Sequence, residues 1–236
     1  MTKNIGFRIK VNIKKPSLQL LDEIKLYPTA NIADCMNRFF CISSEIRLMN
    51  KNKDIKMVGF ALTVKTRPVD NLMVHKAIDM AKQGDIIVVD ANGDINSAII
   101  GEIITLEAIN KKLSGIIIDG CVRDIGVIEK LNFPVFAKGI TPKGPYKDGP
   151  GEINFPISCG GVKISPGDIL VGDADGIVVI PHRDLKFILE KVKEKAKTEY
   201  KIIQDLKKGI NPDKSWIDEI LCKKGCEVVR KDSVYD

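Results

Sequence analysis

Residues 101–126 change from a helical pattern of apolar residues to a short, continuous apolar run. Apolar residues between Leu106 and Leu113 recur at the spacing of an amphipathic helix, whereas the run 116–118 is typical of a strand covered on both faces. A helix that leads directly into such a strand indicates a crossover unit of a parallel sheet. The pattern therefore predicts an α/β fold with mixed strands.

Charged residues stand at both ends of this crossover unit. Arg123 and Asp124 follow the predicted strand, and Glu102 stands at the start of the predicted helix. In crossover units, ligands bind at the carboxyl ends of strands and at helix N-termini. We therefore expect the three charged groups to converge on one pocket. The alternative is a surface ion pair between Arg123 and Asp124, which would contribute at most about 1 kcal/mol.

The spacing of these residues carries a family resemblance. Glu102, twenty intervening residues and then Arg123-Asp124 resemble the acidic-X20-Arg-Asp signature of the 4-hydroxy-4-methyl-2-oxoglutarate aldolase family. That family also contains the regulator of ribonuclease activity A, and its members are often mislabelled as demethylmenaquinone methyltransferases. The similarity spans residues 30–209. Further segments that match the family are Gly59–Val64, Gly84–Asp90, Phe133–Phe136 and Pro166–Gly176.

The resemblance implies a swivelling β/β/α sandwich with mixed sheets and a C-terminal helical appendage. It also implies a homotrimer or homohexamer with sites between subunits. We expect an α/β catalytic domain at residues 1–182, and a C-terminal helix and tail at residues 183–236 that pack on a neighbouring subunit.

The activity that the resemblance implies is that of a metal-dependent, class II type aldolase. Such an enzyme cleaves 4-hydroxy-2-oxo diacids to pyruvate, with oxaloacetate decarboxylation as a second activity. Cleavage beside a 2-oxo group creates an enolate, which needs a cation, a grip on the carboxylate and a proton acceptor. Arg123 is expected to bind the substrate together with Gly101, Ile103 and Ile104 at the helix start. Asp124 is expected to anchor Mg²⁺ or Mn²⁺, which need few protein ligands.

Two glutamates complete the expected catalytic set. Glu102 and Glu199 are expected to orient water, one molecule of which acts as a base. Glu199 falls between Ala196 and Ile203 on an apolar helical stripe, so periodicity leaves open a partnered, buried carboxylate or an exposed one. The resemblance favours the functional alternative, with Glu199 serving a neighbouring subunit. Glu102 departs from the Asp that aldolases of the family typically carry, which leaves the substrate open.

The rival interpretation is a non-catalytic regulator that binds a ribonuclease or helicase. Such a protein needs a docking surface and no metal, so it has no use for Glu102, Arg123, Asp124 and Glu199 together. Methyl transfer finds no support, because a Gly-rich nucleotide-binding loop is lacking after the first predicted strand.

The composition and charge of the chain limit the classes of binding partner that we expect. The 236 residues are 44% hydrophobic and 29% charged, which is ordinary for one substantial core. The net charge of +6 arises from scattered lysines without interleaved aromatics, so we expect a small 2-oxo acid rather than nucleic acid. The N-terminus has no apolar stretch of signal-peptide length, and no run is long enough for a membrane span. A cytoplasmic protein is therefore expected.

Several other residues have alternative interpretations. The six cysteines are expected to be reduced, and Cys121 is interpreted as a packing residue rather than a reactive thiolate. His75 and His182 are interpreted as exposed or capping residues rather than general bases. Segments 90–93 and 173–176 are each expected to form a turn after a strand. The second turn is interpreted as a hairpin rather than a calcium loop.

Residues 139–161 hold six glycines and four prolines, which predicts a long loop with little secondary structure. A loop of this length usually caps a site or contacts a partner. Lys143 and Lys147 lie in it, and either is placed to meet an anionic substrate or to stay solvated.

Overall fold

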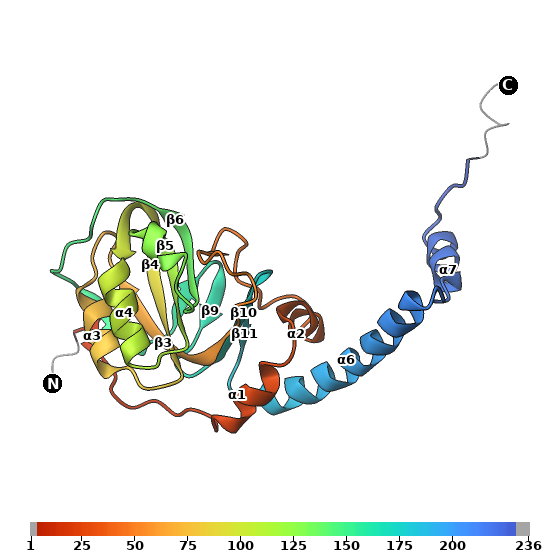
Figure 1. Cartoon of the computed structure of the whole chain (residues 1–236), viewed down its shortest axis with the longest axis horizontal. Helices are drawn as coiled ribbons and strands as arrows, with labels where there is room; N and C mark the ends of the chain where they lie inside the picture. Colours follow the sequence, from red (N-terminus) through yellow and green to blue (C-terminus); the bar gives the residue numbers. More distant parts are fainter. Residues whose placement is uncertain (1–3, 230–236) are drawn as a thin grey trace. The chain divides into compact units, whose positions relative to one another are not determined.

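The computed structural model describes residues 4–229, whose strands and helices alternate along much of the chain (Figure 1). The strands are β1 (Phe7–Ile9), β2 (Arg47–Leu48), β3 (Met57–Thr66), β4 (Asp85–Ile100), β5 (Gly115–Val122), β6 (Val135–Ile140), β7 (Gly151–Ile153), β8 (Ile157–Cys159), β9 (Val162–Ile164), β10 (Ile169–Asp173) and β11 (Gly176–Ile180). The helices are α1 (Gln19–Ile24), α2 (Thr29–Cys35), α3 (Leu72–Met80), α4 (Glu102–Asn110), α5 (Ile125–Ile128), α6 (Leu185–Lys207) and α7 (Ser215–Lys223).

In the described part of the chain, nine strands form one mixed sheet. Seven of them follow the order β1-β7-β3-β4-β5-β6-β2, and β10 and β11 branch from β3. β3, β4, β5 and β6 run parallel, whereas β10 joins β3 in the antiparallel direction. The connections through α3 and α4 are therefore crossover units, and the predicted α/β class with mixed strands is confirmed.

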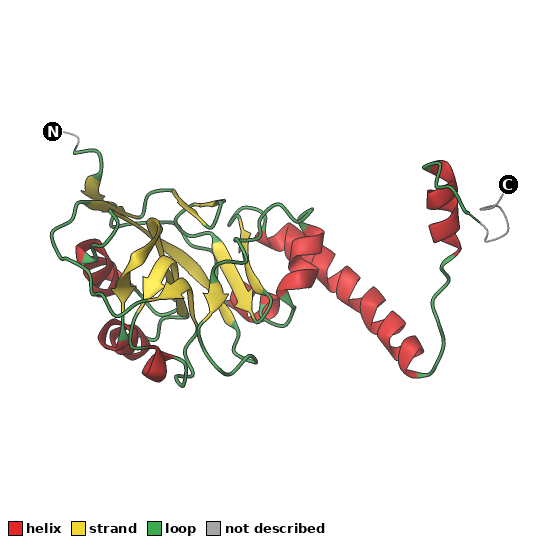
Figure 2. Cartoon of the chain, turned by 90° about the horizontal axis from the view of Figure 1, so that it is seen from above, coloured by secondary structure: helices red, strands yellow, loops and turns green. Residues whose placement is uncertain are grey.

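Both faces of the parallel strands are covered, as the apolar run in β5 predicts. Ile116 and Ile118 belong to a core cluster that includes buried residues of α3 and α4, whereas Ile117 belongs to a second cluster that includes residues of β8 and β9. Helices α3 and α4 lie side by side against the sheet in Figure 1, and Figure 2 shows them along one side of the layer of strands. A strand covered on both faces needs apolar side chains in both directions.

The two predicted turns differ in the structure. Segment 173–176 forms the β10–β11 hairpin, in which Asp173 pairs with Gly176, so the predicted hairpin is confirmed. At segment 90–93, however, β4 continues to Ile100, and the predicted turn is wrong. Asn92 and Gly93 have positive φ angles there, and they shift the register between β4 and β5 without ending the strand.

Two helix ends follow from local contacts, and one predicted loop contains strands. Helix α3 begins at Leu72, whose N–H donates to the Asp70 carboxylate at 3.0 Å. Helix α2 ends at Cys35, shortly before two residues of positive φ. The loop expected at 139–161 contains β7 and β8, since β7 pairs with both β1 and β3.

The chain divides into two compact units, residues 1–193 and 194–236. In the first unit, the beginning of α6 buries Leu185, Ile188, Leu189 and Val192. The second unit holds the rest of α6 and the short helix α7, which has no buried residue. No described helix combines the length and apolar character that crossing a membrane requires.

Candidate active site

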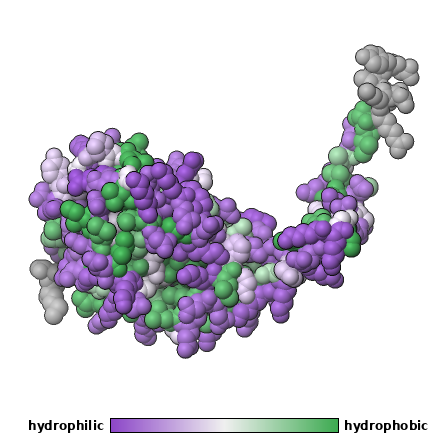
Figure 3. Space-filling model, viewed as in Figure 1, coloured by the Kyte–Doolittle hydropathy of each residue, from purple (hydrophilic) through white to green (hydrophobic). Residues whose placement is uncertain are grey.

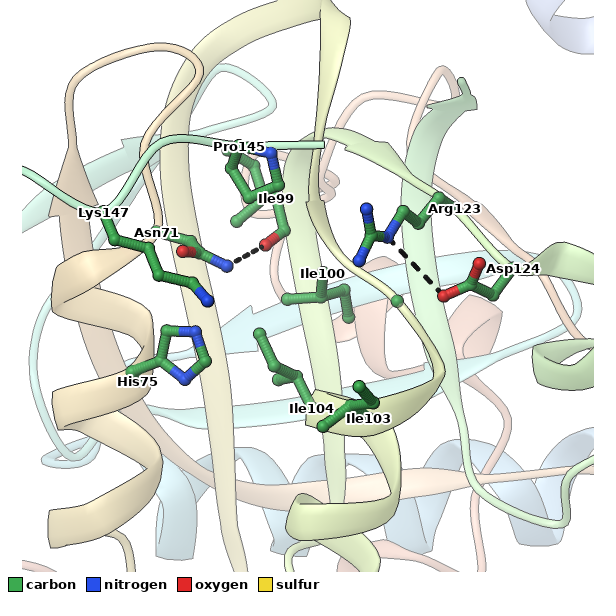
Figure 4. A pocket seen from close by; sticks show the side chains of 11 residues that line it. Asn71, His75, Ile99, Ile100, Ile103, Ile104, Arg123, Asp124, Pro145 and Lys147 are labelled. Carbon is green, nitrogen blue, oxygen red and sulfur yellow. Dashed lines mark hydrogen bonds and ion pairs between the residues drawn. The ribbon is translucent and has the colours of Figure 1, made fainter. Parts of the chain in front are cut away.

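A cavity of about 300 Å³ opens at the carboxyl ends of β4 and β5. The two strands are parallel neighbours, so the residues that follow them lie side by side. The cavity is lined by Asn71, His75, Ile99, Ile100, Gly101, Ile103, Ile104, Arg123, Asp124, Pro145 and Lys147 (Figure 4). This set includes the predicted site residues Gly101, Ile103, Ile104, Arg123 and Asp124.

Asp124 is held in a turn that aims its carboxylate at the start of α4. Its backbone is left-handed, with φ of 57°, and its Oδ2 accepts a hydrogen bond of 3.0 Å from the Glu102 N–H. The Arg123 Nε lies 3.6 Å from the same oxygen. The positive end of the α4 dipole favours a carboxylate there. These contacts use Oδ2, and the described part of the chain shows no hydrogen bond or ion pair to Oδ1.

Two glycines allow the backbone to approach these charged side chains closely. A Cβ atom at Gly101 would lie 2.2 Å from the Asp124 Oδ2, and one at Gly144 would lie 2.7 Å from an Arg123 Nη. Both distances are shorter than non-bonded atoms tolerate. The positions of Arg123 and Asp124 therefore depend on glycine at both sites.

We expect Gly101→Ala to lower the free energy of unfolding by about 1–2 kcal/mol, because the new methyl pushes the Asp124 carboxylate away from the Glu102 N–H. The matched control is Gly126→Ala, since a Cβ atom at Gly126 meets no atom within 4 Å. Urea denaturation of both variants measures the difference. Equal stabilities for the two variants would show that the close approach at Gly101 is unimportant.

The wall opposite Arg123 and Asp124 is formed by Asn71, His75 and Lys147 (Figure 4). The Asn71 Oδ1 and the His75 Nε2 are buried, and neither has a hydrogen-bond partner in the described part of the chain. Such atoms cost about 1–3 kcal/mol each unless a ligand or water satisfies them. Burial lowers the pKa of His75, and the neighbouring Lys147 ammonium lowers it further.

This wall corrects the interpretation of His75 as an exposed or capping residue. His75 is half-buried in the cavity wall, in the first turn of α3. The sequence provided no signal for it, because its neighbour Lys147 stands 72 positions later in the chain. Asn71 was missed for the same reason. Lys147, one of two candidate loop lysines, does line the cavity, whereas Lys143 does not.

The donor set is compatible with a hydrated, hard divalent cation. The described residues contain no group of three His, Cys, Asp or Glu side chains placed to hold a metal. Asp124 offers one open carboxylate oxygen, and its side chain is 42% exposed, so water has access to it. Mg²⁺ and Mn²⁺ fit such a site, because Mg²⁺ keeps several waters and is usually bound by one or two carboxylates.

The two predicted catalytic glutamates lie outside the cavity lining. Glu102 is the first residue of α4, and its backbone N–H donates a hydrogen bond to the Asp124 carboxylate. Glu199 lies on α6 and forms an ion pair of 2.8 Å with Lys195. Glu199 belongs to the second compact unit, residues 194–236, whereas the cavity lies in the first.

Cys121 and His182 lie outside the cavity lining. Cys121 is buried, and burial raises its pKa, with a further rise from Asp94, so its interpretation as a packing residue is confirmed. His182 lies just before α6, where its Nδ1 is 3.3 Å from the Asp168 carboxylate. This contact lies at the end of β11, and neither residue lines the cavity.

Sequence comparisons match the chain to proteins of one family. Residues 29–179 match a family model described as Aldolase/RraA, of the RraA-like family. A protein of Halalkalibacterium halodurans, provisionally named 4-hydroxy-4-methyl-2-oxoglutarate aldolase, is 40% identical over 183 residues, which cover 78% of this chain and 86% of the relative. An uncharacterized protein of Methanocaldococcus jannaschii is 40% identical over 152 residues, covering 64% of this chain and 73% of the relative.

Solved structures show the same fold. An uncharacterized protein of Pseudomonas syringae superposes with a TM-score of 0.75 at 26% identity, covering 84% of this chain and 96% of that protein. The RNA-processing inhibitor RraA of Thermus thermophilis superposes with a TM-score of 0.60 at 25% identity, covering 66% of this chain and 93% of RraA. The swivelling β/β/α fold that the resemblance implies is therefore confirmed. The chain belongs to the RraA-like family.

Proposed function

We propose that this protein is a carbon–carbon lyase, dependent on Mg²⁺ or Mn²⁺, that cleaves 4-hydroxy-2-oxo diacids to pyruvate. Decarboxylation of oxaloacetate would be a second activity, because it passes through the same enolate. The main support is the arrangement of Arg123 and Asp124 beside the N-terminus of α4, in the lining of a cavity. Relatives named as aldolases support the same reaction class.

Arg123 would bind the 2-oxo acid end of the substrate, because its planar guanidinium donates two parallel hydrogen bonds to a carboxylate. The N–H groups of Ile103 and Ile104 lie in the first turn of α4, where no preceding helical turn accepts them. They would bind the other oxygen of this end. Gly101, which is buried, leaves room for the substrate to approach.

Asp124 would hold the divalent cation through its open oxygen. Bound there, the cation would stabilise negative charge on the 2-oxo group. Glu102 and Glu199 would orient water that takes the proton of the 4-hydroxyl group. The bond between C3 and C4 then breaks, C4 becomes a carbonyl, and the electron pair forms the pyruvate enolate. Protonation at C3 completes pyruvate.

The alternative is a non-catalytic regulator that binds a ribonuclease or helicase, and it is supported by the likeness to the RNA-processing inhibitor RraA. The lyase is favoured because a docking protein has no use for a cavity in which the Asn71 Oδ1 and the His75 Nε2 face Arg123 and Asp124 without a partner among residues 4–229.

The direct test is pyruvate release from 4-hydroxy-2-oxo diacids and oxaloacetate, measured with coupled lactate dehydrogenase. We expect a chelator to lower the rate by more than about tenfold, and added Mg²⁺ to restore it, because Asp124 alone cannot stabilise the enolate. The coupling enzyme is checked with added pyruvate under both conditions. Full turnover in excess chelator would contradict the metal-dependent mechanism, and no pyruvate from any substrate would favour the regulator.

A homotrimer or homohexamer would bring a neighbouring copy to the cavity. Exposed apolar side chains gather near α4 in Figure 3, where Ile103 is 69% and Leu106 is 40% exposed. Such a surface beside a site supports contact with a second copy. We propose that the segment 183–236 of one subunit packs on its neighbour's catalytic domain, 1–182, and that Glu199 serves the neighbour's site.

The proposal for Glu199 predicts complementation between two inactive variants. Asp124→Ala and Glu199→Ala should each be nearly inactive alone. Mixed oligomers should recover part of the activity, because some interfaces pair an intact Asp124 with an intact Glu199. Native mass spectrometry confirms mixing, and coupled assays measure the rate. Mixed oligomers without any recovery would show that Glu199 does not act across subunits.

A further inference from the structure

Hydrogen bonds between the loop after β6 and the start of α3 hold the cavity wall opposite Arg123 in place. Asp70 is fully buried just before α3, and its Oδ2 accepts hydrogen bonds from the N–H groups of Asp148 at 2.7 Å and Gly149 at 3.0 Å. Burial acts to raise the pKa of Asp70, but these N–H groups, the Leu72 N–H and nearby Arg67 lower it overall. Asp70 therefore ties the loop after β6 to the start of α3 as a carboxylate.

Backbone hydrogen bonds secure the same connection on the other side of Lys147. The Tyr146 N–H donates to the Val69 carbonyl at 2.7 Å, and the Asn71 N–H donates to the Tyr146 carbonyl at 3.0 Å. Lys147 is thus flanked by two anchored residues, Tyr146 and Asp148. Its ammonium group therefore lies at the wall that also contains Asn71 and His75 (Figure 4).

Two groups of this wall can donate hydrogen bonds to a ligand: the Lys147 ammonium, and the His75 Nε2 when that nitrogen carries the proton. The Lys147 ammonium has three donors, and the buried His75 Nε2 has no partner among the described residues. The Asn71 Nδ2 already donates to the Ile99 carbonyl at 2.9 Å, so its Oδ1 is left as an acceptor. An anionic oxygen would therefore lie between Lys147 and His75 rather than against Asn71.

The floor of the cavity separates this wall from the Arg123 side. It consists of Ile99, Ile100 and Ile104, all buried. A ligand that fills the cavity thus meets a cation at each end and apolar side chains between them. Complementarity of charge favours a molecule with two anionic ends and an uncharged middle.

We propose that Lys147 and His75 form a second carboxylate subsite, which binds the end of the diacid that is remote from the 2-oxo group. The orientation rests on the proposed function, in which Arg123 binds the 2-oxo acid end. The subsite would select diacids over monoacids of the same length. Since the remote carboxylate is not part of the bond that breaks, the effect should appear mainly in KM rather than kcat.

The kinetic test compares two substrates that differ only in this carboxylate. These are 4-hydroxy-2-oxoglutarate and 4-hydroxy-2-oxopentanoate, which carries a methyl group instead, and both release pyruvate. Lys147→Met removes the charge and keeps the length, so the preference for the diacid in kcat/KM should fall by about tenfold or more. Lys147→Arg should retain most of the preference. The control is Lys143→Met, in the same loop but outside the cavity lining, which should not change it.

A binding test separates this inference from the proposed function. Calorimetry in the presence of Mg²⁺ compares 2-oxoglutarate with 2-oxopentanoate, neither of which can undergo the cleavage. We expect the wild-type protein to bind the diacid about tenfold more tightly, and Lys147→Met to lose that difference. This result would support the subsite even if no substrate released pyruvate, in which case the proposed lyase function alone would fail.

The inference is overturned if Lys147→Met weakens the diacid and the monoacid equally, or weakens neither. In the first case Lys147 would support the fold or the whole cavity, and in the second it would be a solvated lysine. Cleavage of the diacid by the wild-type protein together with either result would leave the lyase function standing and remove the subsite.

Discussion

Replacing Asp124 by asparagine is expected to lower the rate of pyruvate release by about a thousandfold, with the fold intact. Removing one stabilising group from a reaction centre typically costs a factor of about 100–1,000, and the loss of a metal anchor stands at the upper end of this range. Asparagine is the informative replacement because, like aspartate, it tolerates the left-handed backbone that Asp124 adopts, with φ of 57°. It also keeps an oxygen that can accept from the Glu102 N–H. The charge is the main property that changes.

The control for this variant is Asp175→Asn, an exposed aspartate of the β10–β11 hairpin that lies outside the cavity lining. Its rate and thermal unfolding temperature should match those of the wild-type protein. Circular dichroism establishes that Asp124→Asn is folded, and coupled assays over a range of Mg²⁺ concentrations measure its rate. An Asp124→Asn rate within about tenfold of wild type would place the metal elsewhere.

The second large effect is expected from Arg123→Lys, which should be almost as damaging as Arg123→Ala. Both variants should lose at least about a hundredfold in kcat/KM. Lysine keeps the positive charge, but it cannot donate two parallel hydrogen bonds in the plane of a carboxylate. The structure adds a steric reason, because the close approach of Gly101 and Gly144 accommodates a flat guanidinium.

Steady-state kinetics of both Arg123 variants with one diacid substrate decide the question. Arg183→Lys, an exposed residue before α6, is the matched control and should leave the kinetics unchanged. Near-normal substrate affinity in Arg123→Lys would mean that Arg123 contributes charge alone, and the bidentate role would have to be abandoned.

The sequence by itself determined the crossover units and the position of the charged turn. The spacing of apolar residues changes between α4 and β5. A helix with one buried face has apolar residues at helical spacing, whereas a strand covered on both faces has a continuous apolar run, so the change marks where the helix ends and the strand begins. Arg123 and Asp124 could be placed at a strand end for this reason, and Glu102 at a helix start. The β10–β11 hairpin was equally local, since its turn residues stand between two short apolar runs.

The tertiary structure alone decided what faces Arg123 and Asp124 across the cavity. His75 had no local signal, because the group that perturbs it, Lys147, belongs to a loop that the Asp70 carboxylate draws to the start of α3. The same loop was expected to have little secondary structure, yet it contains β7, which pairs with β1 and β3. Contacts between residues this far apart produce no repeating pattern in the sequence. The local pattern of each segment indicates a helix, strand or loop, but it does not indicate which distant segment will pack against it. The site combines a local turn with a wall that only long-range packing assembles.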